Sequence, residues 1–259
     1  MTGFVSIDRS EITATVTLAN PERMNALDTT MWSELEKAFV ALSADDGLRC
    51  IVLRGAGDKA FAAGADVAEF ATVRSNPDQA VAYARITHAA LQAVAYCVHP
   101  VVAQVHGVCV GGGLEIASMC DMRICGESSR FGIPIKRLGL VVSYHELTSL
   151  IALVGSAATL EILLEGRVFG ADEALAKGLV NRVVPDAEVE REVDATVSRI
   201  VEGAPLVARW HKRFVRRLAD PAPVTDDEMD ECYSCFDSED FRIGYRAFLD
   251  KRKAAFTGR

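Results

Sequence analysis

The sequence lacks the features that mark several common protein classes. Its net charge is −8, with 28 Lys and Arg against 36 Asp and Glu, so it has no basic excess to neutralise a nucleic-acid backbone. No basic and apolar leader stands at its start, and no uninterrupted apolar run reaches about 18 residues. We therefore expect a cytoplasmic protein that binds neither nucleic acid nor a membrane.

Metal and nucleotide motifs are also missing. The seven cysteines are scattered and odd in number, which favours reduced, buried thiols over a disulfide framework. The one close pair, Cys232 and Cys235, has no second Cys or His pair at ligand spacing. No Gly-Lys-Ser/Thr ending and no Gly-x-Gly-x-x-Gly spacing is present. We expect no metal and no separate cofactor.

What is present is the composition of a soluble globular protein, with 259 residues, 50% hydrophobic and 25% charged. Apolar residues alternate in the first strand-like runs, and strand-like and helical patterns then follow each other, which predicts an α/β fold. Beyond Pro185 every pattern is helical. The expected strands are 4–8, 12–18, 48–53, 101–105, 122–125, 131–135 and 179–185. Asp28 is expected to cap one helix, a long helix is expected over 77–98, and Gly139 leads into another.

A glycine-rich stretch stands at the centre of this pattern. The run Val101–Val105 leads to Gly111, Gly112 and Gly113, and a helical pattern follows, so the glycines are predicted to form a strand-to-helix turn. Free N–H groups at such a turn can stabilise a developing oxyanion. Glu115 falls in the first helical turn, where the helix dipole favours a carboxylate. The local residues alone are equally consistent with tight strand-helix packing and a first-turn charge.

The segment His106–Asp121, together with Lys59–Asp66, resembles the two signature segments of the enoyl-CoA hydratase/isomerase (crotonase) superfamily. Further similarity lies in Asn20–Leu27, in Phe131–Pro134 and in the ending Phe248–Lys253, so the resemblance spans almost the whole chain.

The resemblance implies an architecture. Residues 1–195 would form a crotonase-like spiral of strand-strand-helix units, and residues 196–259 a helical region that packs against neighbouring subunits in a homotrimer or a dimer of trimers. The basic cluster in this region is interpreted as a solvated helix face rather than a functional patch. Its members are His211, Lys212, Arg213, Arg216 and Arg217.

The resemblance also implies a coenzyme A thioester as the substrate. The N–H groups of Ala65 and Gly112 would form an oxyanion hole for the thioester oxygen. The positions implied to bind the substrate or its coenzyme A portion are Met24, Ala26, Ala63, Ala65, Asp66, Val67, Ala68 and Gly112.

Hydratases of this superfamily use two glutamates, and the sequence retains one of them. Glu115 matches the first, whereas the second position is occupied by Ile135, which cannot carry a proton. The loop that follows is also different, and a polar group from Ser143, Tyr144, His145 or Glu146 could enter the site. The favoured alternative is that Ser143 and Glu146 form a helix capping box.

The function expected from the sequence is therefore an acyl-CoA enzyme of enoyl-CoA hydratase or isomerase type, with Glu115 as acid and base. Two alternatives stay open. One is different thioester chemistry, namely isomerisation, decarboxylation or hydrolysis. The other is a non-catalytic acyl-CoA binding protein that keeps the glycine turn, which Ile135 favours and Glu115 opposes.

Overall fold

The computed structural model describes residues 3–259, and it contains two sheets that share one core. The larger sheet has the strand order β1-β2-β3-β5-β7-β10, and the smaller has β4-β6-β8-β9. All pairs in the larger sheet are parallel except β1 with β2. In the smaller sheet, β8 and β9 are antiparallel. The larger sheet consists of β1 (Phe4–Arg9), β2 (Thr13–Ala19), β3 (Cys50–Gly55), β5 (Val101–Val105), β7 (Met122–Gly126) and β10 (Arg182–Val184).

The spiral arises because successive strands alternate between the two sheets. The chain passes from β3 to β4 (Ala60–Ala62), from β5 to β6 (Val108–Val110), and from β7 to β8 (Arg130–Gly132), and helical segments follow each pair. The prediction of strand-strand-helix units is thus confirmed. The short strand β9 (Phe169–Gly170) completes the smaller sheet.

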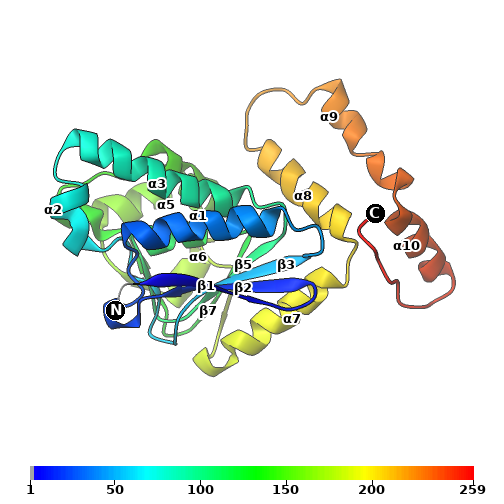
Figure 1. Cartoon of the computed structure of the whole chain (residues 1–259), viewed down its shortest axis with the longest axis horizontal. Helices are drawn as coiled ribbons and strands as arrows, with labels where there is room; N and C mark the ends of the chain where they lie inside the picture. Colours follow the sequence, from blue (N-terminus) through cyan, green and yellow to red (C-terminus); the bar gives the residue numbers. More distant parts are fainter. Residues whose placement is uncertain (1–2) are drawn as a thin grey trace.

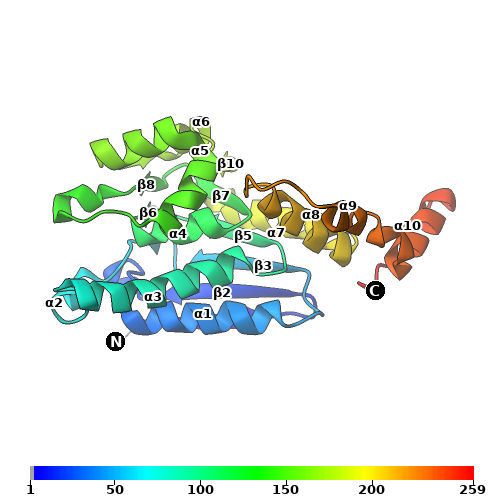
Figure 2. The ribbon, with the colours of Figure 1, turned by 90° about the horizontal axis from the view of Figure 1, so that it is seen from above.

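Helices α1 (Thr29–Ser43) and α3 (Pro77–Ala95) lie side by side along one face of the larger sheet (Figures 1 and 2). Asp28 caps α1, as its sequence predicts, with its carboxylate accepting from the N–H of Met31 at 2.8 Å. The apolar face of α1 is buried, including Trp32 and Phe39. Glu69 ends the 3₁₀ turn η2 (Val67–Glu69), and α2 (Phe70–Val73) then leads towards α3.

Two details of the predicted strands are wrong. The run predicted over 131–135 ends as a strand at Gly132, and Pro134–Leu138 forms a 3₁₀ turn instead, η3, because proline has no N–H for a strand ladder. The strand that enters the central turn is β6, and Val101–Val105 lies one strand earlier. Three-residue strands such as β4 and β6 are too short to show a period in sequence.

Helix α5 (Tyr144–Glu165) is long and apolar, and it is broken at Gly155, where φ is 74°. Its length and composition, with a mean hydropathy of 1.9, would allow it to cross a membrane. Only 17% of that window is buried within this chain. Its buried residues Leu150 and Ile162 join the core. Exposed apolar residues on α5 are Ile151, Leu160 and Leu164. The short helix α6 (Ala171–Ala176) follows.

The C-terminal helices extend away from the sheets (Figures 1 and 2). Helix α7 (Val189–Val201) still packs against β5 and β7 and contains the predicted boundary at residue 195. The segment 205–259, here called the C-terminal arm, holds α8 (Pro205–Arg217), α9 (Asp226–Glu231), η5 (Ser234–Asp237) and α10 (Glu239–Leu249).

The basic cluster on α8 attaches the arm to the core, so the prediction of a wholly solvated face is wrong. Lys212 Nζ lies 2.7 Å from an Asp121 carboxylate oxygen, and its side chain is only 8% exposed. Arg216 donates to the other oxygen of Asp121 at 3.0 Å. Sequence periodicity places these cations on one helical face, but Asp121, the carboxylate that pairs with them, is distant in sequence.

Candidate active site

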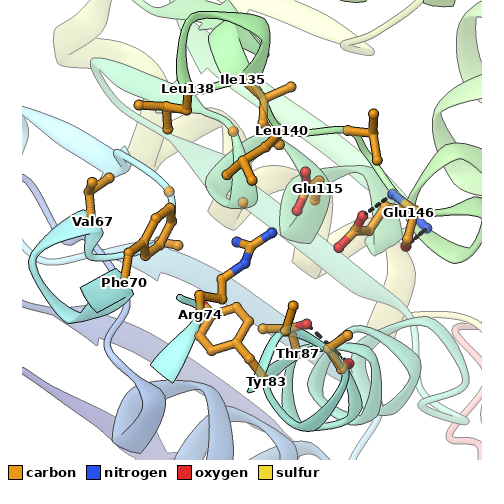
Figure 3. Close-up of a pocket in the computed structure, with 18 of the residues that line it drawn as sticks. Val67, Phe70, Arg74, Tyr83, Thr87, Glu115, Ile135, Leu138, Leu140 and Glu146 are labelled. Atoms are coloured by element: carbon orange, nitrogen blue, oxygen red, sulfur yellow. Dashed lines mark hydrogen bonds between the residues drawn. The ribbon is translucent and has the colours of Figure 1, made fainter. Parts of the chain in front are cut away.

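A cavity of about 410 Å³ opens beside the glycine turn. It lies between the 62–65 segment, the glycine turn, α2, α3 and the start of α5, and Figure 3 shows the side chains that surround it. This size and a mostly apolar lining are typical of a small-molecule site. Its lining side chains include Phe70, Arg74, Tyr83, His88, Glu115, Ile135, Ser143 and Glu146.

One wall of the cavity is backbone. Gly111 has φ 51° and ψ −127°, a conformation that needs glycine, and α4 (Gly112–Met119) begins directly after it. A Cβ on Gly113 would lie 2.2 Å from the Ala62 carbonyl oxygen. The glycines therefore bring the start of α4 against β4, and tight packing and an open N-terminus occur together.

The N–H groups of Ala65 and Gly112 lie close together at this wall. An ideal Cβ on Gly112 would stand 3.5 Å from the Ala65 nitrogen. Leu27 forms a parallel bridge with Ala65 through the Gly64 carbonyl and the Asp66 N–H, which turns the Ala65 N–H to the other side. Within residues 3–259, neither N–H donates a hydrogen bond to the protein. Two neighbouring donors thus border the cavity without a partner.

The segment around Met24 supports this wall from behind. Met24 and Asn25 both have positive φ, 52° and 55°. The Asn25 amide donates to the Ala60 carbonyl at 2.7 Å, and Ala63 donates its N–H to the Met24 carbonyl at 3.0 Å. The turn is thereby joined to the segment that carries Ala65.

The predicted substrate-binding positions divide into two groups. Ala63, Ala65, Val67 and Gly112 line the cavity. Met24 and Ala68 are exposed beside it, Ala26 is nearly buried, and Asp66 caps η2 by accepting from the Ala68 N–H at 3.0 Å. These assignments to coenzyme A binding stay predictions.

Glu115 is the titratable group nearest the glycine turn. It lies in the first turn of α4, and its N–H donates to the Gly111 carbonyl at 3.0 Å. The pKa of its carboxyl is raised to about 8, mainly by burial and also by the Glu146 carboxylate, whereas Arg74 opposes the shift. A group with this pKa can both take up and release a proton near neutral pH.

A second carboxyl group approaches from the start of α5. Ser143 and Glu146 form the predicted capping box, with Glu146 accepting from the Ser143 N–H at 2.6 Å. Both residues also line the cavity, and the Glu115 pKa responds to the Glu146 charge. The capping role and the site role of Glu146 are therefore compatible. Figure 3 shows Glu115 and Glu146 as neighbours.

Tyr144 and His145 do not line the cavity. Tyr144 is 91% exposed, and His145 packs its ring edge-on against His88 at 4.8 Å. Residues one and two places beyond the N-cap point away from the face that Ser143 and Glu146 share, because of the helical turn. An auxiliary catalytic role for Tyr144 and His145 therefore does not fit their position.

Sequence reasoning missed two cavity residues. His88 on α3 places Nε2 2.9 Å from the Ser143 hydroxyl and 3.8 Å from a Glu146 oxygen. Burial lowers the pKa of His88, and Glu146 partly opposes this. Arg74 follows α2 and points into the cavity towards Glu115 (Figure 3). Neither residue belongs to a local motif, so no signal in the chain marks them.

No group of three or more His, Cys, Asp or Glu side chains within residues 3–259 is arranged to hold a metal ion. The cysteines of the same segment are all free thiols. The cavity itself offers unpartnered backbone N–H groups and the carboxyl groups of Glu115 and Glu146.

This geometry can be compared with known proteins. The family model described as enoyl-CoA hydratase/isomerase matches residues 8–259. The chain belongs to the enoyl-CoA hydratase/isomerase family. Its resemblance to the crotonase superfamily, predicted from sequence, is thereby confirmed, and it is an enzyme of hydratase or isomerase type.

Two bacterial hydratases illustrate the similarity in sequence. The chain is 30% identical over 251 residues to a short-chain-enoyl-CoA hydratase of Clostridium acetobutylicum, covering 96% of this chain and 95% of the relative. It is 32% identical over 254 residues to a crotonyl-CoA hydratase of Syntrophomonas wolfei, covering 97% of each.

Solved structures confirm the crotonase fold. An enoyl-CoA hydratase/carnithine racemase from Magnetospirillum magneticum is 50% identical, with a TM-score of 0.97 over 98% of this chain and 96% of that one. An enoyl-CoA hydratase/isomerase family protein from Hyphomonas neptunium is 36% identical, with a TM-score of 0.94 over 98% of both chains.

Proposed function

We propose that the protein transfers a proton at the carbon next to the carbonyl of an enoyl-CoA thioester. The observation that carries this proposal is Glu115, whose carboxyl has a pKa of about 8 and borders a cavity with two unpartnered N–H groups. Family membership supports a coenzyme A thioester as the ligand of that cavity.

In this proposal the N–H groups of Ala65 and Gly112 donate to the thioester oxygen. Their donation strengthens as negative charge develops there, and Gly112 stands at the positive end of the α4 dipole. The remaining predicted positions, from Met24 to Ala68, hold the adenine and pantetheine portions along the outer side of the same wall.

Negative charge on the thioester oxygen corresponds to an enolate, and both hydration and isomerisation can pass through it. In hydration, water adds to the β carbon, Glu146 accepts a water proton, and Glu115 delivers a proton to the α carbon. In isomerisation, Glu115 removes a proton from one carbon and returns it to another, so that the double bond moves. Glu146 in the cavity favours hydration, whereas the apolar Ile135 favours isomerisation, which needs one base.

Incubation with crotonyl-CoA and with its 3-enoyl isomer in D₂O tests both reactions at once. Mass spectrometry separates deuterium incorporation, double-bond migration and addition of water. Glu115→Gln should slow deuterium incorporation from both thioesters by about 10²- to 10⁴-fold. Binding without incorporation in the unaltered protein would contradict the proposed proton transfer on these thioesters and favour an acyl-CoA binding role.

We further infer a homotrimer or a dimer of trimers. The C-terminal arm exposes large aromatic side chains, with Phe248 at 83% and Tyr245 at 58% exposure, and α5 exposes Leu164 at 68%. Apolar surface of this kind is stabilised by burial against a second copy. Sedimentation at micromolar concentration should give one large species, and a 28.0 kDa monomer would contradict the inference.

A further inference from the structure

Arg74 is a cation in a mostly apolar cavity, and the proton transfer above does not use it. It lines the cavity and points towards Glu115 in Figure 3. Within residues 3–259, its guanidinium forms no ion pair and donates no hydrogen bond that the structure records. A guanidinium carries five N–H donors, and those of Arg74 are left for a ligand in the cavity.

Two aromatic rings fix the position of this guanidinium. Its central carbon lies 4.9 Å from the ring centroid of Phe70 and 5.0 Å from that of Tyr83. Cation–π contacts of this kind hold the guanidinium without supplying a hydrogen-bond acceptor to its N–H groups. The cation is therefore held in place while its hydrogen-bonding capacity stays available to a ligand.

The nearby carboxyl groups do not satisfy Arg74. Glu115 has a pKa of about 8 and is mostly protonated at neutral pH. Glu69 is held elsewhere, accepting from the Thr29 N–H at 2.8 Å and the Thr29 hydroxyl at 2.9 Å. Glu146 accepts from the Ser143 N–H at 2.6 Å. The positive charge of Arg74 is thus left for an incoming anion.

We propose that Arg74 binds a carboxylate at the far end of the acyl chain, so that the preferred substrates are ω-carboxyacyl-CoA thioesters. The inference rests on the proposed function, which places the thioester at Ala65 and Gly112. Arginine and carboxylate match in a two-bond, fork-like geometry that lysine cannot reproduce. An anionic phosphate of coenzyme A is the other source of the same charge, and the experiment separates the two.

The experiment measures binding by calorimetry with saturated thioesters, which do not react. Glutaryl-CoA is compared with the length-matched, neutral pentanoyl-CoA and with free coenzyme A. The unaltered protein should bind glutaryl-CoA about 10- to 100-fold more tightly than pentanoyl-CoA, as expected for charge-assisted hydrogen bonds. Succinyl- and adipyl-CoA then report the chain length at which the preference is largest.

Arg74→Gln should abolish this preference and leave the affinity for pentanoyl-CoA within about 3-fold, because only the charge pair is lost. Arg74→Lys should retain part of it. Arg137→Gln is the matched control, since Arg137 also lines the cavity but is exposed, and this variant should keep the full preference.

Three results would overturn the assignment. The first is an unchanged preference for glutaryl-CoA in Arg74→Gln, and the second is loss of that preference in Arg137→Gln instead. The third is an equal loss of affinity for free coenzyme A and for both thioesters in Arg74→Gln. The last result would assign Arg74 to the coenzyme A phosphates. Failure of the unaltered protein to bind any thioester would instead contradict the proposed function, so the two failures are distinguishable.

Discussion

The two walls of the cavity are built in different ways. The wall at Gly64, Ala65 and Gly112 consists of backbone, and these residues lie in the two segments that resemble the signature segments of the family. The opposite wall consists of side chains from α2, α3 and α5, including Arg74 and Glu146. This comparison suggests that the backbone wall provides the shared chemistry and that the side-chain wall selects the substrate and the outcome. The predictions below test that division.

The largest effect is expected at Glu115, which lies between the two walls. Glu115→Gln keeps the shape but cannot take up a proton, so the rate of deuterium incorporation should fall by about 10²- to 10⁴-fold. Thioester affinity should change little. Glu190→Gln, an exposed substitution of the same kind, is the control. An unchanged rate in folded Glu115→Gln would mean that this glutamate is structural.

The backbone wall is tested by Gly64→Ala. Gly64 has φ +99°, which an alanine adopts only under strain, so its substitution should displace the neighbouring Ala65 N–H. Loss of one oxyanion donor costs about 10²- to 10³-fold in rate.

Gly57→Ala separates strain from position. Gly57 has φ +72° and no atom within 4 Å of an added Cβ, so this variant carries similar backbone strain away from the cavity. It should lower stability but not the rate of the folded enzyme. Equal loss of activity in both variants would show that strain alone is responsible.

The side-chain wall is tested by Glu146→Gln. Glutamine can still serve in a capping box, so α5 should keep its start while the second proton carrier is lost. Hydration should fall by about 10²-fold, and deuterium incorporation by less than about 10-fold. Glu228→Gln alters the matching capping box of α9 and should affect neither reaction. Equal losses in both reactions would place Glu146 with the shared chemistry.

The smallest effect concerns stability and pH. The Glu115 carboxyl has a pKa of 4.5 as its ordinary value and about 8 in the folded protein, so between these values the folded state holds a proton that the unfolded state releases. Stability should therefore fall as pH rises from 4.5 to 8. Glu115→Gln removes this penalty.

The Tm of Glu115→Gln should exceed that of the unaltered protein by about 2–4 °C for each kcal/mol gained in the free energy of unfolding. This difference should appear only as the pH approaches 8. The Glu190→Gln control should melt like the unaltered protein at every pH. A Tm difference that does not grow with pH would show that Glu115 is not held protonated by the fold.

Sequence reasoning was most successful where a local pattern carries the information. The caps at Asp28 and Ser143 depend on residues three places away, and both are confirmed. The three-residue strands β4 and β6 were missed, because their hydrogen-bond partners come from distant parts of the chain and their length shows no period.

The sequence by itself determined the family, the α/β fold, the glycine turn and the position of Glu115 at the start of a helix. Only the tertiary structure decided which side chains face that helix. It places Glu146 near Glu115, and it brings Arg74 between Phe70 from its own segment and Tyr83 from α3. The physical reason is that a pKa or an unsatisfied charge depends on burial and on neighbours in space, which the order of residues along the chain does not specify.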